Sequence, residues 1–137
     1  GSYSDRERSS SICAWNVEEQ SGFIMDADLG AAFENFDSQH IFVFFDSCHS
    51  GGMDGVAGPG RYVSQTAGVQ ELGLDAPKHE HGMWVYWFLE YAIKEMGNSD
   101  LTRAYDVAYP PAVSDAASVD NPMHPEEEWG GSGAFYL

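Results

Sequence analysis

The sequence predicts an α/β fold, with a largely parallel sheet covered by helices in one domain over residues 1–137. Strand-like and helix-like segments alternate along the chain, which is typical of such layered folds. The run Ile41–Phe45 is apolar at every position and rich in strand-favouring residues, as expected of a central strand buried on both faces. A chain of 137 residues with 43% hydrophobic residues can form one core of ordinary size.

The individual elements follow from periodicity and from residues that start or stop helices. Apolar residues at helical spacing predict a helix from Asp26 and another over 83–96, which Gly97 should close. A third helix should begin at Ser99 and end at Pro110-Pro111, because proline lacks the amide hydrogen and its ring clashes with the preceding turn. We expect four strands, at 12–17, 41–45, 61–67 and 133–137. Long loops are expected at 51–60, 68–82 and 112–133.

Acidic residues outnumber basic ones by 22 to 6, giving a formal net charge of −16. Such a field repels nucleic acid and anionic membranes and attracts cations and basic peptides. A solvated acidic surface, a high-salt habitat and divalent-ion binding are three explanations that remain open. No apolar run approaches the roughly 18 residues needed to cross a bilayer, and no targeting signal is visible, which favours the cytoplasm. Cys13 and Cys48 are expected to be free thiols, because two cysteines cannot form a disulfide framework.

Cys48 is the strongest candidate for a catalytic residue. It lies just beyond the predicted strand 41–45, at the sheet edge where reactive groups gather in parallel α/β folds. Gly51 and Gly52 follow it, and their lack of a Cβ lets backbone N–H groups approach a substrate oxygen. A thiol becomes an efficient nucleophile once a base or a positive pocket favours the thiolate. The alternative is an inert packing cysteine, against which the polar and glycine-rich neighbours argue.

The segment Phe-Phe-Asp-Ser-Cys-His-Ser-Gly-Gly at 44–52 resembles the nucleophile segment of the caspase-like cysteine peptidases, specifically the metacaspases and their prokaryotic relatives. The resemblance extends to a strand and acidic helix start within 12–29 and to a helix segment at 82–90. It implies a caspase-hemoglobinase fold, a three-layer sandwich with a mostly parallel sheet that is incomplete here at its N-terminal side. It also implies amide hydrolysis through an acyl-enzyme thioester and a Cys/His dyad.

No histidine of the chain matches the catalytic position of that family. Caspase-type enzymes carry this histidine about 50 residues before the cysteine and directly before a glycine. Gly1 corresponds to that glycine, so we expect an upstream segment or chain to supply the dyad histidine. His40 lies at the opposite end of the Cys48 strand, and His49 should project elsewhere. The other histidines lie in loops or near the tail: His79, His81 and His124.

The resemblance assigns substrate recognition to Asp46, two residues before Cys48. A carboxylate there favours Arg or Lys before the scissile bond, through charge-assisted hydrogen bonds. The caspases proper carry Gln at this position, so cleavage after Asp is not expected. The alternative is that Asp46 caps the turn after the strand. A second acid of this pocket corresponds to Asn16, which weakens the negative charge.

Many metacaspases need calcium, and Asp26, Asp28 and Asp54 approximately match the positions of the family's calcium ligands. Because Ca²⁺ takes six to eight oxygens, these three carboxylates would form only part of a site. Helix capping by Asp26 and simple exposure of Asp54 are the alternatives. Self-cleavage is expected after Arg61 or Lys78, and Lys78 is the better candidate because Arg61 begins a predicted strand.

The sequence therefore favours the cysteine-bearing portion of a metacaspase-type endopeptidase for peptide or protein substrates with Arg or Lys before the scissile bond. A non-catalytic caspase-like interaction or scaffold domain is the alternative, because the chain has no assignable base. A calcium-binding module is a third reading. No organic cofactor, nucleic acid or membrane partner is expected.

Overall fold

The central sheet is mixed and has three strands. The computed structural model describes residues 10–13 and 22–137. The strand order is β3–β4–β7, with β3 (Ile41–Phe45) parallel to β4 (Arg61–Gln65) and β7 (Glu126–Trp129) antiparallel to β4. The strand β7 lies in a stretch that the sequence predicts to be loop, since three consecutive acids disfavour a strand. It forms nevertheless, because its backbone pairs with the buried β4 while its side chains alternate between exposed and half-buried positions.

The remaining strands form two small antiparallel sheets. They are β1 (Ser11–Cys13) with β2 (Phe23–Met25), and β5 (Asp75–Ala76) with β6 (His81–Gly82). Only the β3–β4 pair is parallel among the described strands. The predicted mostly parallel, caspase-hemoglobinase-like sandwich is therefore wrong. The chain is instead a small domain of short mixed and antiparallel sheets, because the segments after β4 return as an antiparallel strand and a two-residue ladder.

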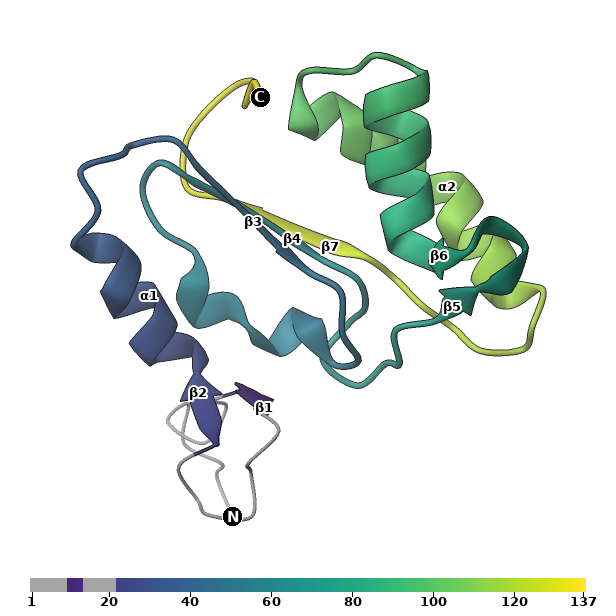
Figure 1. Ribbon diagram of the computed structural model, residues 1–137, viewed down its shortest axis with the longest axis horizontal. Helices are drawn as coiled ribbons and strands as arrows, with labels where there is room; N and C mark the ends of the chain where they lie inside the picture. The colour runs from purple at the N-terminus through teal and green to yellow at the C-terminus, as the bar shows by residue number, and fades with distance from the viewer. Residues whose placement is uncertain (1–9, 14–21) are drawn as a thin grey trace.

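Three main helices accompany the sheets: α1 (Asp26–Glu34), the π-type helix η6 (Val85–Glu95) and α2 (Leu101–Ala117). Short 3₁₀ turns lie at η3 (Ser50–Gly52), η4 (Asp54–Val56) and η5 (Pro77–His79). In Figure 1, α1 lies on one side of the central sheet, and η6 and α2 lie on the other. No described helix is long and apolar enough to cross a lipid bilayer.

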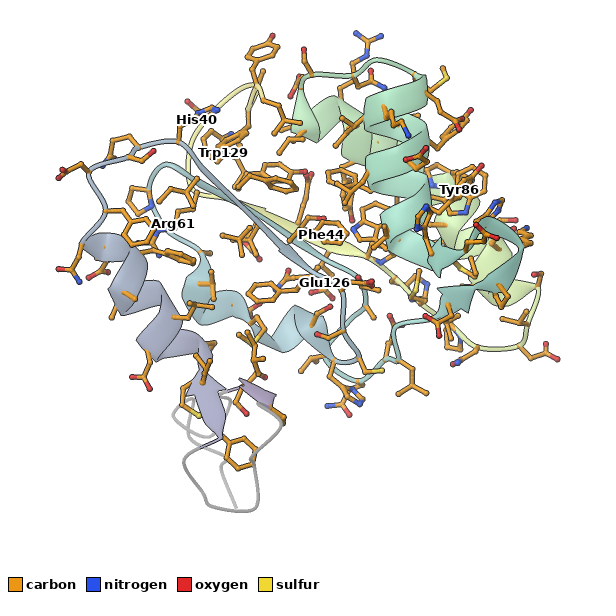
Figure 2. All side chains as sticks on the ribbon, in the orientation of Figure 1. His40, Phe44, Arg61, Tyr86, Glu126 and Trp129 are labelled. Atoms are coloured by element: carbon orange, nitrogen blue, oxygen red, sulfur yellow. The ribbon has the colours of Figure 1, made fainter. Side chains whose placement is uncertain are left out.

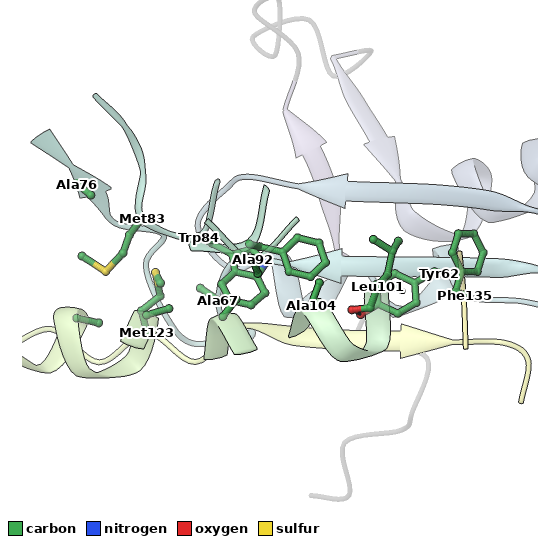
Figure 3. Close-up of a cluster of buried hydrophobic side chains, with 14 residues drawn as sticks. Tyr62, Ala67, Ala76, Met83, Trp84, Ala92, Leu101, Ala104, Met123 and Phe135 are labelled. Carbon is green, nitrogen blue, oxygen red and sulfur yellow. Dashed lines mark hydrogen bonds between the residues drawn. The ribbon is translucent and has the colours of Figure 1, made fainter. Parts of the chain in front are cut away.

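The strand β3 contacts both layers, as its unbroken apolar run predicts, but it is an edge strand of the sheet, and the central, fully buried strand is β4. Phe42 and Phe44 pack against the cluster formed with η6 and α2, whereas Val43 and Phe45 belong to the cluster beside α1. Figure 3 shows the larger cluster, which holds the fully buried Trp84. A row of buried small residues along α2 lets η6 approach closely: Ala104, Ala108, Ala112 and Ala116.

The helix α2 differs from its prediction at both ends. Its N-cap is Asp100 rather than Ser99, and the Asp100 carboxylate accepts a 3.1 Å hydrogen bond from the Thr102 N–H. The helix runs through Pro110-Pro111 and ends at Ala117. Its buried alanine row continues past the prolines, so packing against η6 offsets the backbone hydrogen bonds that the prolines cannot make.

The predicted strand 61–67 ends at Gln65 in β4, two residues earlier than expected. Of the predicted strand 12–17, Ile12 and Cys13 lie in β1, and residues 14–17 lie outside the described residues. At 133–137 the chain forms a single antiparallel bridge, between Asp100 and Tyr136. Phe135 next to this bridge is buried, and backbone hydrogen bonds from Leu101 N–H to the Phe135 carbonyl and from Leu137 N–H to the Ser99 carbonyl hold the segment without a strand.

Candidate active site around Cys48

Cys48 lies in the turn that follows β3. Its thiol is free and exposed, and Sγ lies 3.9 Å from the Gly73 carbonyl oxygen. The thiol lines a pocket of about 530 Å³ between β1 and the turn. The lining residues are Ser10, Ser11, Ile12, Cys13, Ser47, Cys48, His49, Ser50 and Met53. The nucleophile candidate is therefore accessible from a cavity large enough to admit side chains of a peptide.

The turn after Cys48 is held in an unusual backbone conformation. His49 has φ of 60°, in the left-handed region that non-glycine residues seldom adopt. Two hydrogen bonds fix this residue: its N–H donates to the Glu71 carbonyl at 2.8 Å, and its Nδ1 lies 3.1 Å from the Val69 carbonyl. Such local strain persists where the surrounding structure determines it, which is common at functional sites.

The predicted oxyanion residues Gly51 and Gly52 pack tightly and use their N–H groups within the fold. Gly51 N–H donates to the Ala67 carbonyl at 2.7 Å, and Gly52 N–H donates to the His49 carbonyl at 3.0 Å. A Cβ on Gly52 would lie 2.0 Å from Ser10 Oγ, so a side chain at this position would displace Ser10. By contrast, the Cys48 N–H has no hydrogen-bond acceptor among the described residues. The oxyanion role of the two glycines stays a prediction, and the Cys48 N–H is the better available donor.

Asp46 is exposed and is not among the residues that line the Cys48 pocket. Its Oδ1 accepts a 3.1 Å hydrogen bond from Thr66 Oγ1, just beyond β4. Its Oδ2 faces Gly82, where a Cβ would lie only 2.6 Å away. Asn16, the other predicted substrate-binding residue, lies outside the described residues.

Four of the described histidines, His40, His49, His79 and His124, are bonded or stacked away from the Cys48 thiol. His40 lies at the far end of β3, where Nε2 bonds the Tyr136 carbonyl and the ring stacks on Phe135 at 3.9 Å. Figure 2 shows His40 and Glu126 at opposite ends of the central sheet. His79 stacks on Tyr86 with ring centroids 3.5 Å apart. Within the described chain, no histidine makes a hydrogen bond to Cys48 Sγ.

Glu71 joins the loop beside Cys48 to the tail, a role that sequence reasoning missed. Its carboxylate accepts hydrogen bonds from Gly68 N–H at 3.1 Å, from His124 N–H at 2.7 Å and from His124 Nδ1 at 2.5 Å. Burial raises the pKa of Glu71, but the bonds from His124 and Gly68 outweigh it, so the pKa lies below its ordinary 4.5. Nothing in the sequence links these residues, because 53 positions separate Glu71 from His124.

A second carboxylate, Glu126, approaches the same turn from β7. Its Oε2 lies 2.6 Å from where a Gly51 Cβ would be. Burial raises the pKa of Glu126, and the nearby charges of Asp54 and Glu71 raise it further. The surroundings of the Cys48 turn therefore carry a concentrated negative charge.

The predicted calcium ligands do not come together. Asp26 is buried and its Oδ2 accepts a 3.0 Å hydrogen bond from Gly55 N–H, while Oδ1 has no partner in the described structure. Asp28 and Asp54 are exposed. The described ranges contain no group of three or more His, Cys, Asp or Glu side chains arranged to hold a metal ion. These residues do not fit the expected site, and a calcium requirement stays a prediction without support from them.

The two predicted self-cleavage residues differ in access. Arg61 is 4% exposed, and its Nη1 donates to the Gly30 and Val56 carbonyls at 3.1 and 2.9 Å. A cut after Arg61 would require the first residue of β4 to leave the core. Lys78 is exposed and forms a 3.2 Å ion pair with Asp115 of α2.

No protein-family model and no curated protein matches the chain.

Proposed function

We propose that the chain is the cysteine-bearing part of a metacaspase-type endopeptidase that cleaves after Arg or Lys. The observation that carries the proposal is the segment 44–52, with the exposed Cys48 thiol directly after a core strand and on the wall of a pocket of about 530 Å³. A nucleophile needs such access, whereas a packing cysteine is normally buried.

The proposed reaction is amide hydrolysis in two steps. The Cys48 thiolate attacks the scissile carbonyl carbon, and the Cys48 N–H donates to the oxygen as negative charge develops on it. The C–N bond then breaks, the amine leaves with a proton from the dyad histidine, and an acyl-thioester remains on Cys48. Water, deprotonated by the same histidine, hydrolyses this thioester. A segment upstream of Gly1 supplies the histidine in this proposal.

The preference for Arg or Lys rests on Asp46 and on its neighbours. Thr66 donates to Oδ1, and Oδ2 lies against Gly82, where a Cβ would be only 2.6 Å away. Because Asp46 is exposed, a guanidinium or ammonium group that approaches from solvent would form a charge-assisted hydrogen bond with the carboxylate. The negative charge around the turn and the net charge of −16 attract a basic peptide.

Self-cleavage after Lys78 would change the loop that adjoins the nucleophile. Gly73 packs on the backbone of Ser47 and Cys48, so the loop that begins after Thr66 lies directly over the turn. Lys78 lies five residues further along the same connection, and its exposed side chain is restrained by Asp115. Cutting the Lys78–His79 bond would release the downstream end of this loop and widen access to Cys48.

The test uses the full-length protein, including the segment before Gly1, and two peptidyl amides that differ only in Arg or a neutral isostere. Cys48→Ala should reduce hydrolysis of the Arg substrate by far more than the roughly 100-fold expected for one lost oxyanion donor. Cys13→Ala, the matched control at the other thiol of the pocket, should keep most of the activity. Unchanged turnover in Cys48→Ala would overturn the proposal.

Specificity is tested with Asp46→Asn in the same assay. A charged hydrogen bond is worth about 1.5 to 3 kcal/mol, so kcat/KM for the Arg substrate should fall about 10- to 150-fold and that for the neutral isostere should change little. Gly82→Ala is the companion variant, because it keeps the charge and fills the space beside Oδ2. Equal losses on both substrates in Asp46→Asn would mean that Asp46 only shapes the turn.

A non-catalytic interaction or scaffold domain is the second candidate. The observation that favours it is that no described histidine hydrogen-bonds to Cys48. The residues encoded before Gly1 separate the two functions: a Ser-Gly-His or similar sequence there favours the enzyme. A full-length protein that binds basic peptides equally well with and without the Cys48 thiol, and cleaves none, would be a scaffold.

A further inference from the structure

The two cysteines of the chain face the same pocket. Cys13 comes from β1 and Cys48 from the turn after β3, 35 positions apart in sequence. Both are free, both are exposed, and both line the cavity of about 530 Å³. Two thiols on one cavity wall can combine into a disulfide after one of them is oxidised, which a single thiol cannot do.

The structure shows why β1 lies beside the nucleophile turn. Ser10, which leads into β1, accepts a 2.9 Å hydrogen bond from Asp26 N–H through its carbonyl, and its side chain fills the space that Gly52 leaves open. The contact anchors the start of β1 against the turn, and Cys13 follows three residues later. The missing side chain at Gly52 therefore positions the second thiol.

We propose that Cys13 and Cys48 form a redox pair that closes into an intramolecular disulfide when a hydroperoxide oxidises one of them. A disulfide needs Cα atoms within about 7 Å, so β1 and the turn must close over the cavity. Among the described side chains of β1 and β2, Ile12, Phe23 and Ile24 are 38 to 46% exposed, so these three add little apolar packing against this movement. The β1 ladder pairs with β2 alone among the described strands, so both can shift together.

The chemistry balances with the peroxide as oxidant. The Cys48 thiolate attacks one peroxide oxygen, the S–O bond forms as the O–O bond breaks, and Cys48 becomes a sulfenic acid with release of water or an alcohol. The Cys13 thiolate then attacks the Cys48 sulfur, the S–S bond forms, and hydroxide leaves and is protonated to water. A dithiol reductant breaks the disulfide by thiol–disulfide exchange and restores both thiols.

The pair gives a regulatory consequence that rests on the proposed function: an oxidised Cys48 is not a nucleophile, so peroxide would switch the peptidase off reversibly. Cys13 would also protect Cys48 from irreversible oxidation, because disulfide formation competes with the step to sulfinic acid. The disulfide itself requires no peptidase activity and is measured separately.

The experiment treats the full chain with dilute hydrogen peroxide at low protein concentration and follows thiol titre and intact mass. We expect loss of both thiols, a mass lower by two hydrogens, and a 13–48 cross-link on peptide mapping that dithiothreitol removes. In Cys13→Ser, Cys48 should instead advance to sulfinic acid. The control combines Cys13→Ser with Ile24→Cys, which places an exposed thiol on the same hairpin but away from the pocket lining. Its intramolecular cross-link should form at least about tenfold more slowly.

Independent oxidation of the two thiols, or equal cross-linking from position 24, would overturn the redox pair. A cross-link in a protein that cleaves no peptide would leave the pair intact and would instead count against the peptidase. An active peptidase whose Cys48 becomes sulfinic acid at the same rate with and without Cys13 would exclude the pair and keep the peptidase.

Discussion

The two faces of the central sheet are built differently. The face towards η6 and α2 rests on 14 buried residues that include Trp84, Phe88 and a row of alanines. Among the described residues, the face towards α1 rests on four buried ones, Phe45, Met53, Val56 and Val63. The turn that carries Cys48 lies at the edge of the smaller cluster, through Met53. Apolar burial, the main favourable term in folding, is thus concentrated away from the candidate site.

The unequal apolar burial on the two faces means that different contacts stabilise the fold and fix the geometry of the candidate site. Beside the smaller cluster, Arg61 bonds two backbone carbonyls and Asp26 bonds Gly55. Directional hydrogen bonds fix positions, while each adds only about 1 kcal/mol to stability. The larger cluster therefore provides most of the apolar burial, whereas the Cys48 turn is positioned by hydrogen bonds with the loop after β4, from His49 N–H to the Glu71 carbonyl and from Gly51 N–H to the Ala67 carbonyl.

The largest effect is expected from truncation in the larger cluster. Trp84 is fully buried, stacks on Phe88 at 5.0 Å and donates from Nε1 to Ser64 Oγ at 2.9 Å. Trp84→Ala should cost about 3 to 5 kcal/mol of unfolding free energy. Met53→Ala in the smaller cluster should cost about 2 kcal/mol, the lower end for a buried methionine. Urea unfolding of both variants measures the difference, and equal losses would refute the asymmetry between the faces.

How far the sequence predicts this molecule depends on whether the information is local. The run Ile41–Phe45 predicts a central strand covered on both faces; β3 confirms the strand and its contacts on both faces, whereas its central place is wrong, because β3 lies at the edge of the sheet. The helical period of 83–96 predicts a helix there, and η6 confirms it; Gly97 at φ of 72° also confirms its place after the helix end. These signals need only neighbouring residues, because side-chain periodicity and left-handed glycine are local properties.

The errors involve contacts between distant segments. The acidic run of β7 forms a strand only because β4 offers it a partner, and α2 passes its prolines only because η6 packs along it. Strand direction cannot be read from periodicity, so the mostly parallel sheet was a wrong expectation. The same holds for the candidate site. The position of Cys48 after β3 can be predicted from the local sequence, whereas its contact with the loop anchored by Glu71 cannot.

The next largest effect is expected at Glu71, on the site side. Glu71→Ala removes three accepted hydrogen bonds and should cost about 1 to 3 kcal/mol at pH 7. Because the folded pKa is lowered, this contribution is complete above the ordinary value of 4.5 and is lost as pH falls through the lowered folded value. The gap between variant and wild type should therefore shrink at pH 3. Glu34→Ala, an exposed carboxylate on α1, is the control and should change little.

Glu127, on the helical side, should show the opposite dependence on pH. Burial raises its pKa above the ordinary 4.5 despite the hydrogen bond with Tyr62, and the charges of Asp106 and Asp100 add to the shift. The Tyr62 hydroxyl has one hydrogen and faces both Glu127 and the Leu101 carbonyl. A protonated Glu127 can donate to Tyr62, which frees the hydroxyl hydrogen for Leu101.

The stabilisation by protonated Glu127 is complete below pH 4.5 and is lost as pH rises through the raised pKa of the folded state. Glu127→Gln keeps a donor at every pH, so it should be more stable than wild type by about 1 kcal/mol at pH 7, the size of one hydrogen bond. The two proteins should be nearly equal at pH 4. Chemical unfolding at both pH values measures this, and a variant less stable at pH 7 would show that the carboxylate form is the one the fold favours.

The smallest effect is expected at the turn between η6 and α2, within the more stable half. Gly97 has φ of 72°, and nothing lies within 4 Å of the position that a Cβ would occupy. Gly97→Ala therefore causes no clash and costs only the backbone strain of the left-handed region, about 1 kcal/mol. Gly97→Asn should recover most of that loss, because asparagine adopts this conformation more readily. Thermal unfolding of the two variants separates backbone strain from packing. Equal losses of stability for Ala and Asn would mean that the added side chain itself disturbs the turn. The stability of the helical half would then depend on its surface residues as well as on its core.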